Sequence, residues 1–271
     1  MLFAASFTFA QSNISNVSQV GNENEAGVTQ RGNQNQSLVV QNDHINTIEV
    51  SQNGLGNVSE AQMSGGSNEV SIAQDGDANA SVSLITEANN AVLVSQAGNE
   101  NVVRQELNTA DSDATVIQEG DNNRVIQAQS GVSNNSAFVQ QVGGGNLATQ
   151  EQNGENNNVS VDQLGDNASA IFSQTGTSNN VAARQEGMSN AMSVRQNGSN
   201  NFAGGGNDVL LDQLGNNNDA TLVQEGDENA SALMQMGNRN KASNAQTGNQ
   251  NNNIINQLGN RNSAIVTQEQ N

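Results

Sequence analysis

The chain of 271 residues lacks cysteine, proline, tryptophan and tyrosine, and it contains a single histidine. These absences exclude a disulfide scaffold and argue against zinc fingers, iron–sulfur sites and histidine-based catalysis. Hydrophobic residues make up 33% of the chain, against about 45–50% in an ordinary globular domain. A conventional apolar core is therefore not expected.

Acidic and amide side chains are what the sequence has in excess. Asp plus Glu number 27 against 8 Lys plus Arg, which gives a net charge of −19, and 49 Asn and 30 Gln are present. The negative charge argues against a nucleic-acid partner, because phosphates would be repelled. Two classes remain: a disordered amide-rich chain, or a repeat protein that is stabilised by ladders of stacked side chains.

The first ten residues, MLFAASFTFA, differ from the rest of the chain because they combine apolar and small residues without side-chain charge. Residues 1–10 are interpreted as the remnant of a secretory signal peptide with cleavage after Ala10, the alternative being a short hydrophobic tail. No other segment approaches the ~18 apolar residues that span a membrane. We expect an exported chain, 11–271, without membrane insertion.

Glutamine recurs with a step of eleven residues along nearly the whole chain. One extra residue before Gln141 and six before Gln213 interrupt the step, and the recurring residues are Gln19, Gln30, Gln41, Gln52, Gln74, Gln96, Gln118, Gln129, Gln141, Gln152, Gln163, Gln174, Gln185, Gln196, Gln213, Gln224, Gln235, Gln246, Gln257 and Gln268. Two residues after most of them comes glycine, as at Gly21, Gly32, Gly54, Gly76, Gly98, Gly120, Gly165, Gly226 and Gly259. Five residues after comes asparagine, as at Asn24, Asn35, Asn46, Asn57, Asn229, Asn240 and Asn262. The unit is N-x5-Q-x-G-x-x.

Within each unit, the second and fourth residues after asparagine are small or apolar, as Ile48 and Val50 are, and their neighbours are mixed. This period of two indicates a strand with one face inward. The Q-x-G-x-x segment predicts a turn, because glycine admits positive φ and asparagine tolerates it. A glycine in every unit would cost a helix about 1 kcal/mol each, so a helix is not competitive.

Strand and turn together form a 22-residue repeat of strand–turn–strand–turn. Two strands cannot bury a face alone, so we expect successive repeats to stack in register into an all-β, two-sheet β-solenoid of cross-β type. There are 23 units between Asn13 and Gln268, or about 11.5 turns. Each inward Asn and Gln amide is expected to bond the identical amide above and below it. Disorder remains the better description of the newly exported monomer.

The unit resembles the curlin repeat, the S/N-x5-Q-x-G-x-x-N-x5-Q module of bacterial curli subunits, over about residues 13–268. The resemblance implies a secreted functional amyloid of Gram-negative bacteria: a cell-surface, pilus-like fibre of the biofilm matrix that mediates adhesion. It also implies partners, namely a nucleator subunit, an outer-membrane secretion pore and chaperones. The chain departs from familiar subunits in having more than twice their repeats and in opening its units with Asn rather than Ser.

The resemblance leaves the kind of subunit open. Nucleators of the family tend to have basic, irregular terminal repeats, and Arg239, Lys241 and Arg261 are three of the eight basic residues here. The terminal repeats nevertheless keep Asn, Gln and Gly in place, which favours the major subunit.

The period breaks where Met63, Ile85 and Leu107 stand in place of glutamine. These residues are 22 apart, so they are expected to stack on one side, where an apolar spine replaces three rungs of an amide ladder. Turns on that edge lose glycine and have Asp43, Glu87 and Thr109 instead. A tuned, slower-folding region and simple drift in a duplicated block both account for the replacement.

The second break is the glycine-rich insertion FAGGGN near residues 202–207. Because residues 207–213 themselves match the unit, with Asn207 opening it and Val209 and Leu211 inward, the six added residues are predicted to lengthen the turn after Gln196. A phosphate-binding loop is not indicated, since no lysine follows and no helix is expected.

Candidate catalytic or metal-binding groups are few. His44 beside Asp43 has no nucleophile near it in sequence, and the Asp75–Asp77 and Asp111–Asp113 pairs lack the spacing of calcium repeats. Solvated turn residues explain them better, with weak Ca²⁺ binding as the alternative. Outward acidic charge also limits lateral clumping. We expect no enzyme and no cofactor.

The expected function follows from the two ends of the solenoid, where ordinary repeat sequence would present unpaired strand edges and open ladders to the next copy. We therefore expect a self-polymerising structural subunit of a fibre. The alternatives are a monomeric β-solenoid adhesin, a nucleator, and an enzyme on a β-helix, for which no catalytic cluster is found.

Overall fold

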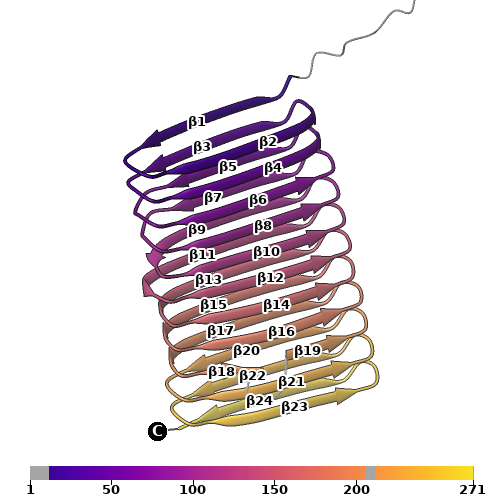
Figure 1. Ribbon diagram of the computed structural model, residues 1–271. Helices are drawn as coiled ribbons and strands as arrows, with labels where there is room; N and C mark the ends of the chain where they lie inside the picture. The colour runs from indigo at the N-terminus through magenta and orange to yellow at the C-terminus, as the bar shows by residue number, and fades with distance from the viewer. Residues whose placement is uncertain (1–11, 205–210, 271) are drawn as a thin grey trace, which may run out of the picture.

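The computed structural model describes residues 12–204 and 211–270, in which all regular structure is β-strand. The chain winds back and forth between two facing sheets, so the strands form a tall, flat stack that runs from the N-terminal to the C-terminal layers (Figure 1). The first sheet consists of β1 (Ile14–Val20), β3 (Gln36–Asn42), β5 (Val58–Met63), β7 (Ala80–Ile85), β9 (Val102–Ala110), β11 (Arg124–Ser133), β13 (Leu147–Glu155), β15 (Ser169–Thr177), β17 (Ala191–Ser199), β20 (Asp219–Glu225), β22 (Lys241–Thr247) and β24 (Ser263–Glu269).

The second sheet faces the first across the core. It consists of β2 (Glu25–Asn33), β4 (Thr47–Leu55), β6 (Glu69–Asp75), β8 (Ala91–Ala97), β10 (Asp113–Glu119), β12 (Ser136–Val142), β14 (Asn158–Leu164), β16 (Asn180–Glu186), β18 (Phe202–Ala203), β19 (Leu211–Leu214), β21 (Ala230–Met236) and β23 (Asn252–Leu258). β18 and β19 both pair with β16 and β21, so they are two halves of one layer. The second sheet thus has eleven layers against the twelve of the first.

Every pairing is parallel and joins equivalent residues of successive repeats, and the register shifts only within β11 among the described strands. In the second sheet, for example, Gln52 of β4 pairs with Gln74 of β6 and Val50 pairs with Ile72. Such pairing places identical side chains directly above one another, which is the geometry that stacked amides require. The prediction of a two-sheet β-solenoid of about 11.5 turns is confirmed.

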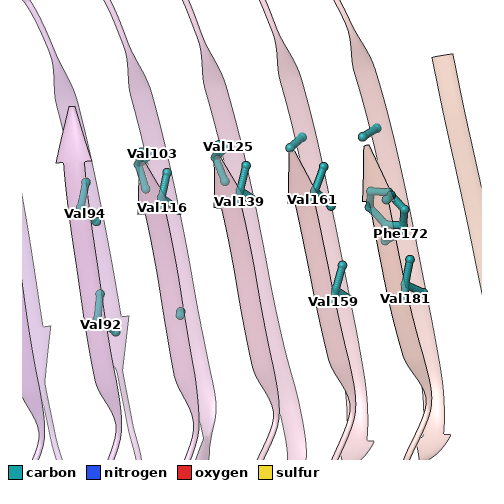
Figure 2. Close-up of a cluster of buried hydrophobic side chains, with 14 of the residues drawn as sticks. Val92, Val94, Val103, Val116, Val125, Val139, Val159, Val161, Phe172 and Val181 are labelled. Atoms are coloured by element: carbon teal, nitrogen blue, oxygen red, sulfur yellow. The ribbon is translucent and has the colours of Figure 1, made fainter. Parts of the chain in front are cut away.

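The core lies between the sheets and is built from the alternating residues of each strand. Val50 and Ile72 are each 1% exposed, while their outward neighbours are accessible. Figure 2 shows valines of successive strands stacked in columns, with Phe172 as the one aromatic ring labelled among them. Each layer adds few apolar atoms, so burial must be repeated along the stack to stabilise the fold.

Glycine in the turns is required for two reasons. Gly98 has φ +117, a value that L side chains rarely adopt, and a Cβ there would lie 2.1 Å from the carbonyl oxygen of Gly120 in the next layer. The close approach is possible because glycine has no side chain. The final turn residue is left-handed as well, with φ near +58 at positions such as Glu100.

The two irregularities of the period differ in how they are accommodated. The single extra residue falls at a register shift in β11, between Ser130 and Ser133, where Val132 points outward and is 67% exposed. It therefore forms a β-bulge and leaves the following layers in register.

The predicted position of the six-residue insertion is wrong. Asn201, rather than Asn207, has the ladder position, because its backbone N–H donates to Oδ1 of Asn179 and its own Oδ1 accepts from the N–H of Asn229. The turn after Gln196 keeps its ordinary length, and the added residues fall between Ala203 and Leu211, which pair with Val181 and Ala183 of the same strand, β16. Leu211 is inward and 1% exposed, as predicted.

Some expectations concern residues outside the described parts of the chain. The signal-peptide remnant at residues 1–10 lies there, as do Asn207 and Val209 of the insertion. Within the described residues, no helix is long and apolar enough to cross a membrane.

Candidate assembly surfaces and the amide ladders

The second sheet has an unbroken column of glutamines along its inward edge. Each Nε2 donates to the Oε1 of the glutamine in the next layer at 2.7–2.9 Å, and the column consists of Gln30, Gln52, Gln74, Gln96, Gln118, Gln141, Gln163, Gln185, Gln213, Gln235 and Gln257. Each Nε2 also donates to a backbone carbonyl of the first sheet, as Gln52 does to Gln36 at 2.9 Å. The ladder therefore ties layers together along the stack and the two sheets across it.

The glutamine column of the first sheet is interrupted. Gln19 donates to Gln41, and the bonds resume with Gln129, after which they run through Gln152, Gln174, Gln196, Gln224, Gln246 and Gln268. Met63, Ile85 and Leu107 fill the three layers between them in register, and none is more than 2% exposed.

The apolar block leaves different atoms at its two ends. On one side, Gln41 Nε2 has lost its amide acceptor but donates to the carbonyl of Asn46 at 2.9 Å. On the other side, Gln129 Oε1 is buried without a hydrogen-bond partner, because Leu107 has no amide to donate. A buried unsatisfied acceptor costs about 1–3 kcal/mol, and one block of three replacements incurs that cost once.

A second, inner glutamine ladder lies in the first sheet beside this block. Gln105 Nε2 donates to Gln127 Oε1 at 2.8 Å, and Gln127 donates to Gln150 at 2.8 Å. Both ends are satisfied, since Ser83 Oγ donates to Gln105 Oε1 and Gln150 Nε2 donates to the carbonyl of Phe138. The sequence interpretation missed this ladder, although the 22- and 23-residue spacing of its members was a visible signal.

The asparagine columns are stacked, but most of their bonds differ from the amide-to-amide bonds that we expected. In a typical layer, the backbone N–H of Asn57 donates to Oδ1 of Asn35 at 3.0 Å, and Asn57 Nδ2 donates to the carbonyl of Gly76 at 2.7 Å. Some layers add an amide-to-amide bond, as Asn101 Nδ2 does to Asn79 Oδ1. Asparagine is short enough to bond nearby backbone groups, so Asn57 holds the turn glycine of the next layer in place.

The stacked asparagines predicted from the repeat all occupy these columns. Asn24, Asn35, Asn46, Asn57, Asn229, Asn240 and Asn262 each bond a residue of the adjacent layer. The turn glycines Gly21, Gly32, Gly54, Gly76, Gly98, Gly120, Gly165, Gly226 and Gly259 all have positive φ.

A third ladder runs along the turns and was not foreseen. The third residue after glutamine accepts a backbone N–H from the layer before it, as Asp77 Oδ1 does from Leu55 and Asp121 Oδ1 from Asn99. Asn238 continues the same column near the C-terminal layers, where it accepts from Asn216. Several turn carboxylates are therefore acceptors within the fold rather than free charges.

On the outward face of the second sheet, Asp162, Arg184 and Asp212 form a charged column on neighbouring strands. Burial raises the pKa of Asp162 and of Asp212, and the Arg184 guanidinium opposes the shift of each pKa. Asp212 Oδ1 is buried without a hydrogen-bond partner.

The candidate chemical groups are turn residues. His44 is exposed, and Asp43 accepts the backbone N–H of Gly65 through Oδ2. Among residues 12–204 and 211–270, no group of three or more His, Asp and Glu side chains could hold a metal ion.

The end layers of the described chain present open ladder groups. Gln19 and Gln30 donate to the next layer, but their own Oε1 atoms accept no bond from the described residues. At the other end, Gln257 and Gln268 each donate one bond to a backbone carbonyl and lack the second bond that glutamines of inner layers make. One end therefore offers acceptors and the other offers donors.

Comparison with known families bears on the repeat itself. The curlin-associated repeat family matches residues 133–165 and 215–243, which include β12 to β14, β20 and β21 and the first residues of β22. The chain contains curlin repeats. The resemblance of the N-x5-Q-x-G unit to this family is thereby confirmed, and the same unit continues through the other layers. No curated protein matches the chain significantly.

Curlin repeats on a β-solenoid are typical of a structural, curli-like amyloid subunit rather than of a catalytic protein. The functional features of such a chain are the stacked columns and the strand edges that they leave open.

Proposed function

We propose that this chain is the repeating structural subunit of an extracellular curli fibre in a bacterial biofilm matrix, and that the fibre grows by addition of copies to the ends of the solenoid. The observation that carries the proposal is the in-register parallel stacking of one unit upon itself in every layer. A strand edge built this way is a template for any further copy of the same unit.

The open groups of the end layers support the proposal. All seven residues of β1 are exposed, and the apolar side chains of Ile14, Val17 and Ile265 are 48–78% exposed. Stacking a further layer on either end would bury these side chains and pair the free backbone groups, as each inner layer does.

The acidic composition fits growth along one axis. The chain has a net charge of −19, and most of its charged residues lie at outward positions and in turns. The broad faces of two solenoids therefore repel each other, whereas contacts between solenoid ends do not bring these faces together. As in the curlin family, a nucleator subunit, an outer-membrane secretion pore and chaperones are the expected partners, and the bacterial surface is the expected location.

Seeded aggregation tests this function. Purified chain is expected to form thioflavin-T-positive fibres with a lag phase that preformed fibres abolish, and negative-stain microscopy should show unbranched filaments. A variant with a charged, proline-rich extension after residue 271 should add to fibres poorly at that end, since proline cannot donate to a strand ladder. The same length of Gly/Ser extension is the matched control. A stable soluble monomer that never elongates seeds would contradict the proposal and favour the monomeric adhesin.

A further inference from the structure

The two end faces of the described chain are not equivalent. An inference about how they fit each other rests on the proposed function, which is growth by addition of copies to the ends. The C-terminal face is formed by β23 of the second sheet and β24 of the first, and the N-terminal face by β1 of the first sheet and β2 of the second. A copy placed on top could put its β1 over β24, in the same sheet, or over β23, in the opposite sheet.

Height along the stack distinguishes these two arrangements. Because each half-turn rises by half a layer, the next free position above β24 belongs to the second sheet, directly over β23. Placing β1 of the next copy over β24 would leave one strand position of the second sheet empty, with about 4.8 Å of unpaired backbone. Placing it over β23 fills that position and requires a half-turn rotation about the stack axis.

We propose that copies dock head to tail with this half-turn rotation, so that β23 pairs with β1 and β24 with β2 of the next copy. Each fibre sheet then alternates between the first sheet of one copy and the second sheet of its neighbour.

The sequences of β24 and β2 fit this pairing residue by residue. β24 reads SAIVTQE and β2 reads EAGVTQR, so both contain A-x-V-T-Q in the same register. The inward Ala264 and Val266 would continue into Ala26 and Val28 of the next copy, and Gln268 would donate to the open Oε1 of Gln30. Matched inward residues preserve the volume of the core across the junction.

The outward residues of this pair are complementary as well. Ile265 is 78% exposed, and its partner would be Gly27, beside which an added Cβ would meet nothing within 4 Å. Glu269 would stand beside Arg31, and the four ion pairs among the described residues include neither of these two side chains. Docking would therefore cover an exposed isoleucine and pair two opposite charges.

The β23 and β1 faces agree with the same arrangement. Leu258 and Val20, which are 65% and 62% exposed, would become neighbours on one outward column. Asn253 Nδ2, which is buried without a partner, would face the hydroxyl of Ser15 in the next layer. In the turn column, Arg261 follows Arg239 and would be followed by Glu23, so a repulsive pair would gain an opposite charge.

Unrotated docking lacks these matches. It would place Glu269 beside Val20 and Ala264 over Ser15, and it would leave Arg31 and Arg261 without the acidic partners described above. Head-to-head docking would oppose the acceptor atoms of Gln19 and Gln30 to those of a second N-terminal face.

Disulfide trapping tests the rotation, because the natural chain has no cysteine. Neighbouring strands about 4.8 Å apart lie within the Cα separation that a disulfide spans. Fibres of a V20C/L258C variant are expected to yield covalent multimers on oxidation and denaturation, whereas fibres of V20C/E269C, the pair that unrotated docking would join, are expected to remain monomeric. The two sites of each variant lie at opposite ends of one chain, so intramolecular linkage does not compete.

Charge reversal provides an independent arm. R31E and E269R should each slow seeded elongation about three- to tenfold, and the R31E/E269R double variant should recover most of the wild-type rate. Cross-linking of V20C/E269C alone, or of neither variant in well-formed fibres, would overturn the rotated docking and leave the fibre function intact. Absence of fibres from the wild-type chain overturns both.

Discussion

The half-turns of the second sheet differ from those of the first in their regularity. In all eleven layers of the second sheet, the unit keeps its glutamine, a glycine two residues later and an apolar fourth residue. The first sheet departs at all three positions, and most of the departures fall together between β3 and β13: an apolar block in the glutamine column, Asp43, Glu87 and Thr109 in the glycine column, and Ser83 followed by glutamines in the apolar column. Asn244 of β22 and Gln270 after β24 are the departures outside this region.

The difference shows that residues of one type in a stacked column are mostly replaced over several adjacent layers rather than in single layers. A lone replacement inside an amide ladder leaves one donor and one acceptor without partners, whereas a run of replacements leaves the same two ends however long it is. The block of three apolar residues has one orphan atom, Gln129 Oε1, and the inner ladder, closed by Ser83 and the carbonyl of Phe138, has none along its amide chain.

The largest expected effect comes from the turn column. Gly98→Val in the second sheet's turns adds a Cβ 2.1 Å from the Gly120 carbonyl at φ +117, so we expect a loss of about 3–5 kcal/mol in the free energy of unfolding. Glu87→Gly, at the equivalent position of a turn that already lacks glycine, should cost about 1 kcal/mol. Guanidinium unfolding followed by far-UV circular dichroism measures both. Equal losses of stability in the two variants would contradict the different requirement for glycine in the turns of the two sheets.

The next effect concerns the unbroken ladder. Gln96→Leu removes the bonds to Ala80 and Gln118 and leaves Gln118 Oε1 buried without a donor, so we expect a loss of about 2–4 kcal/mol.

The matched control is Gln129→Leu in the first sheet. It lengthens the apolar block by one layer and transfers the orphan acceptor from Gln129 to Gln152. The number of orphan atoms is unchanged, so the expected loss is about 1 kcal/mol. Denaturation midpoints compare the two variants, and a Gln129→Leu loss as large as that of Gln96→Leu would refute the block argument.

A smaller effect is expected in the inner ladder. Gln127→Val breaks it in the middle and leaves Gln150 Oε1 without its donor, at a cost of about 1–3 kcal/mol. Replacing Gln105, Gln127 and Gln150 together by valine should be close to neutral, because the column then matches the apolar column that faces it. If the triple variant instead lost the sum of the three single losses in free energy of unfolding, each glutamine would stabilise the chain independently of the ladder.

The smallest expected effect is a pH dependence of stability that comes from Asp162 and Asp212 on the outward face of the second sheet. The pKa values of Asp162 and Asp212 are raised above 3.8 in the folded chain, so the stability associated with their protonated forms is present below pH 3.8 and is lost as the pH rises through the raised values.

We therefore expect these two groups to weaken the folded state as the pH rises above 3.8, and the D162N/D212N variant to weaken less over the same rise. The pH dependence of the denaturation midpoint measures this. A steeper dependence in the variant would contradict the assigned shifts.

Much of the fold could be predicted from the sequence because the repeat imposes one register. The eleven-residue step and the alternation at residues such as Ile48 and Val50 specify strand, turn and inward face, and parallel stacking follows once two strands cannot bury a face alone. The site of the insertion could not be predicted, because Asn201 and Asn207 both fit the motif. The choice between them depends on which one reaches the Asn179 column.

The hydrogen-bond partners of individual amides could not be predicted from the sequence either. The spacing placed asparagine and glutamine in columns alike, but Asn57 bonds backbone groups of the adjacent layers while Gln52 bonds the next glutamine. The difference comes from side-chain length, since the short asparagine side chain keeps Oδ1 close to the backbone N–H of the adjacent layer, whereas the extra methylene of glutamine carries its amide away from that N–H and toward the next glutamine.

By itself, then, the sequence determined the period, the strands, the inward columns and the number of half-turns, because these depend on spacing along the chain. Only the tertiary structure decided which donors meet which acceptors, which asparagine occupies the ladder position before the insertion, and which atoms remain open at the end layers. Those outcomes depend on distances of a few ångströms between layers, which are defined only when the repeats are stacked.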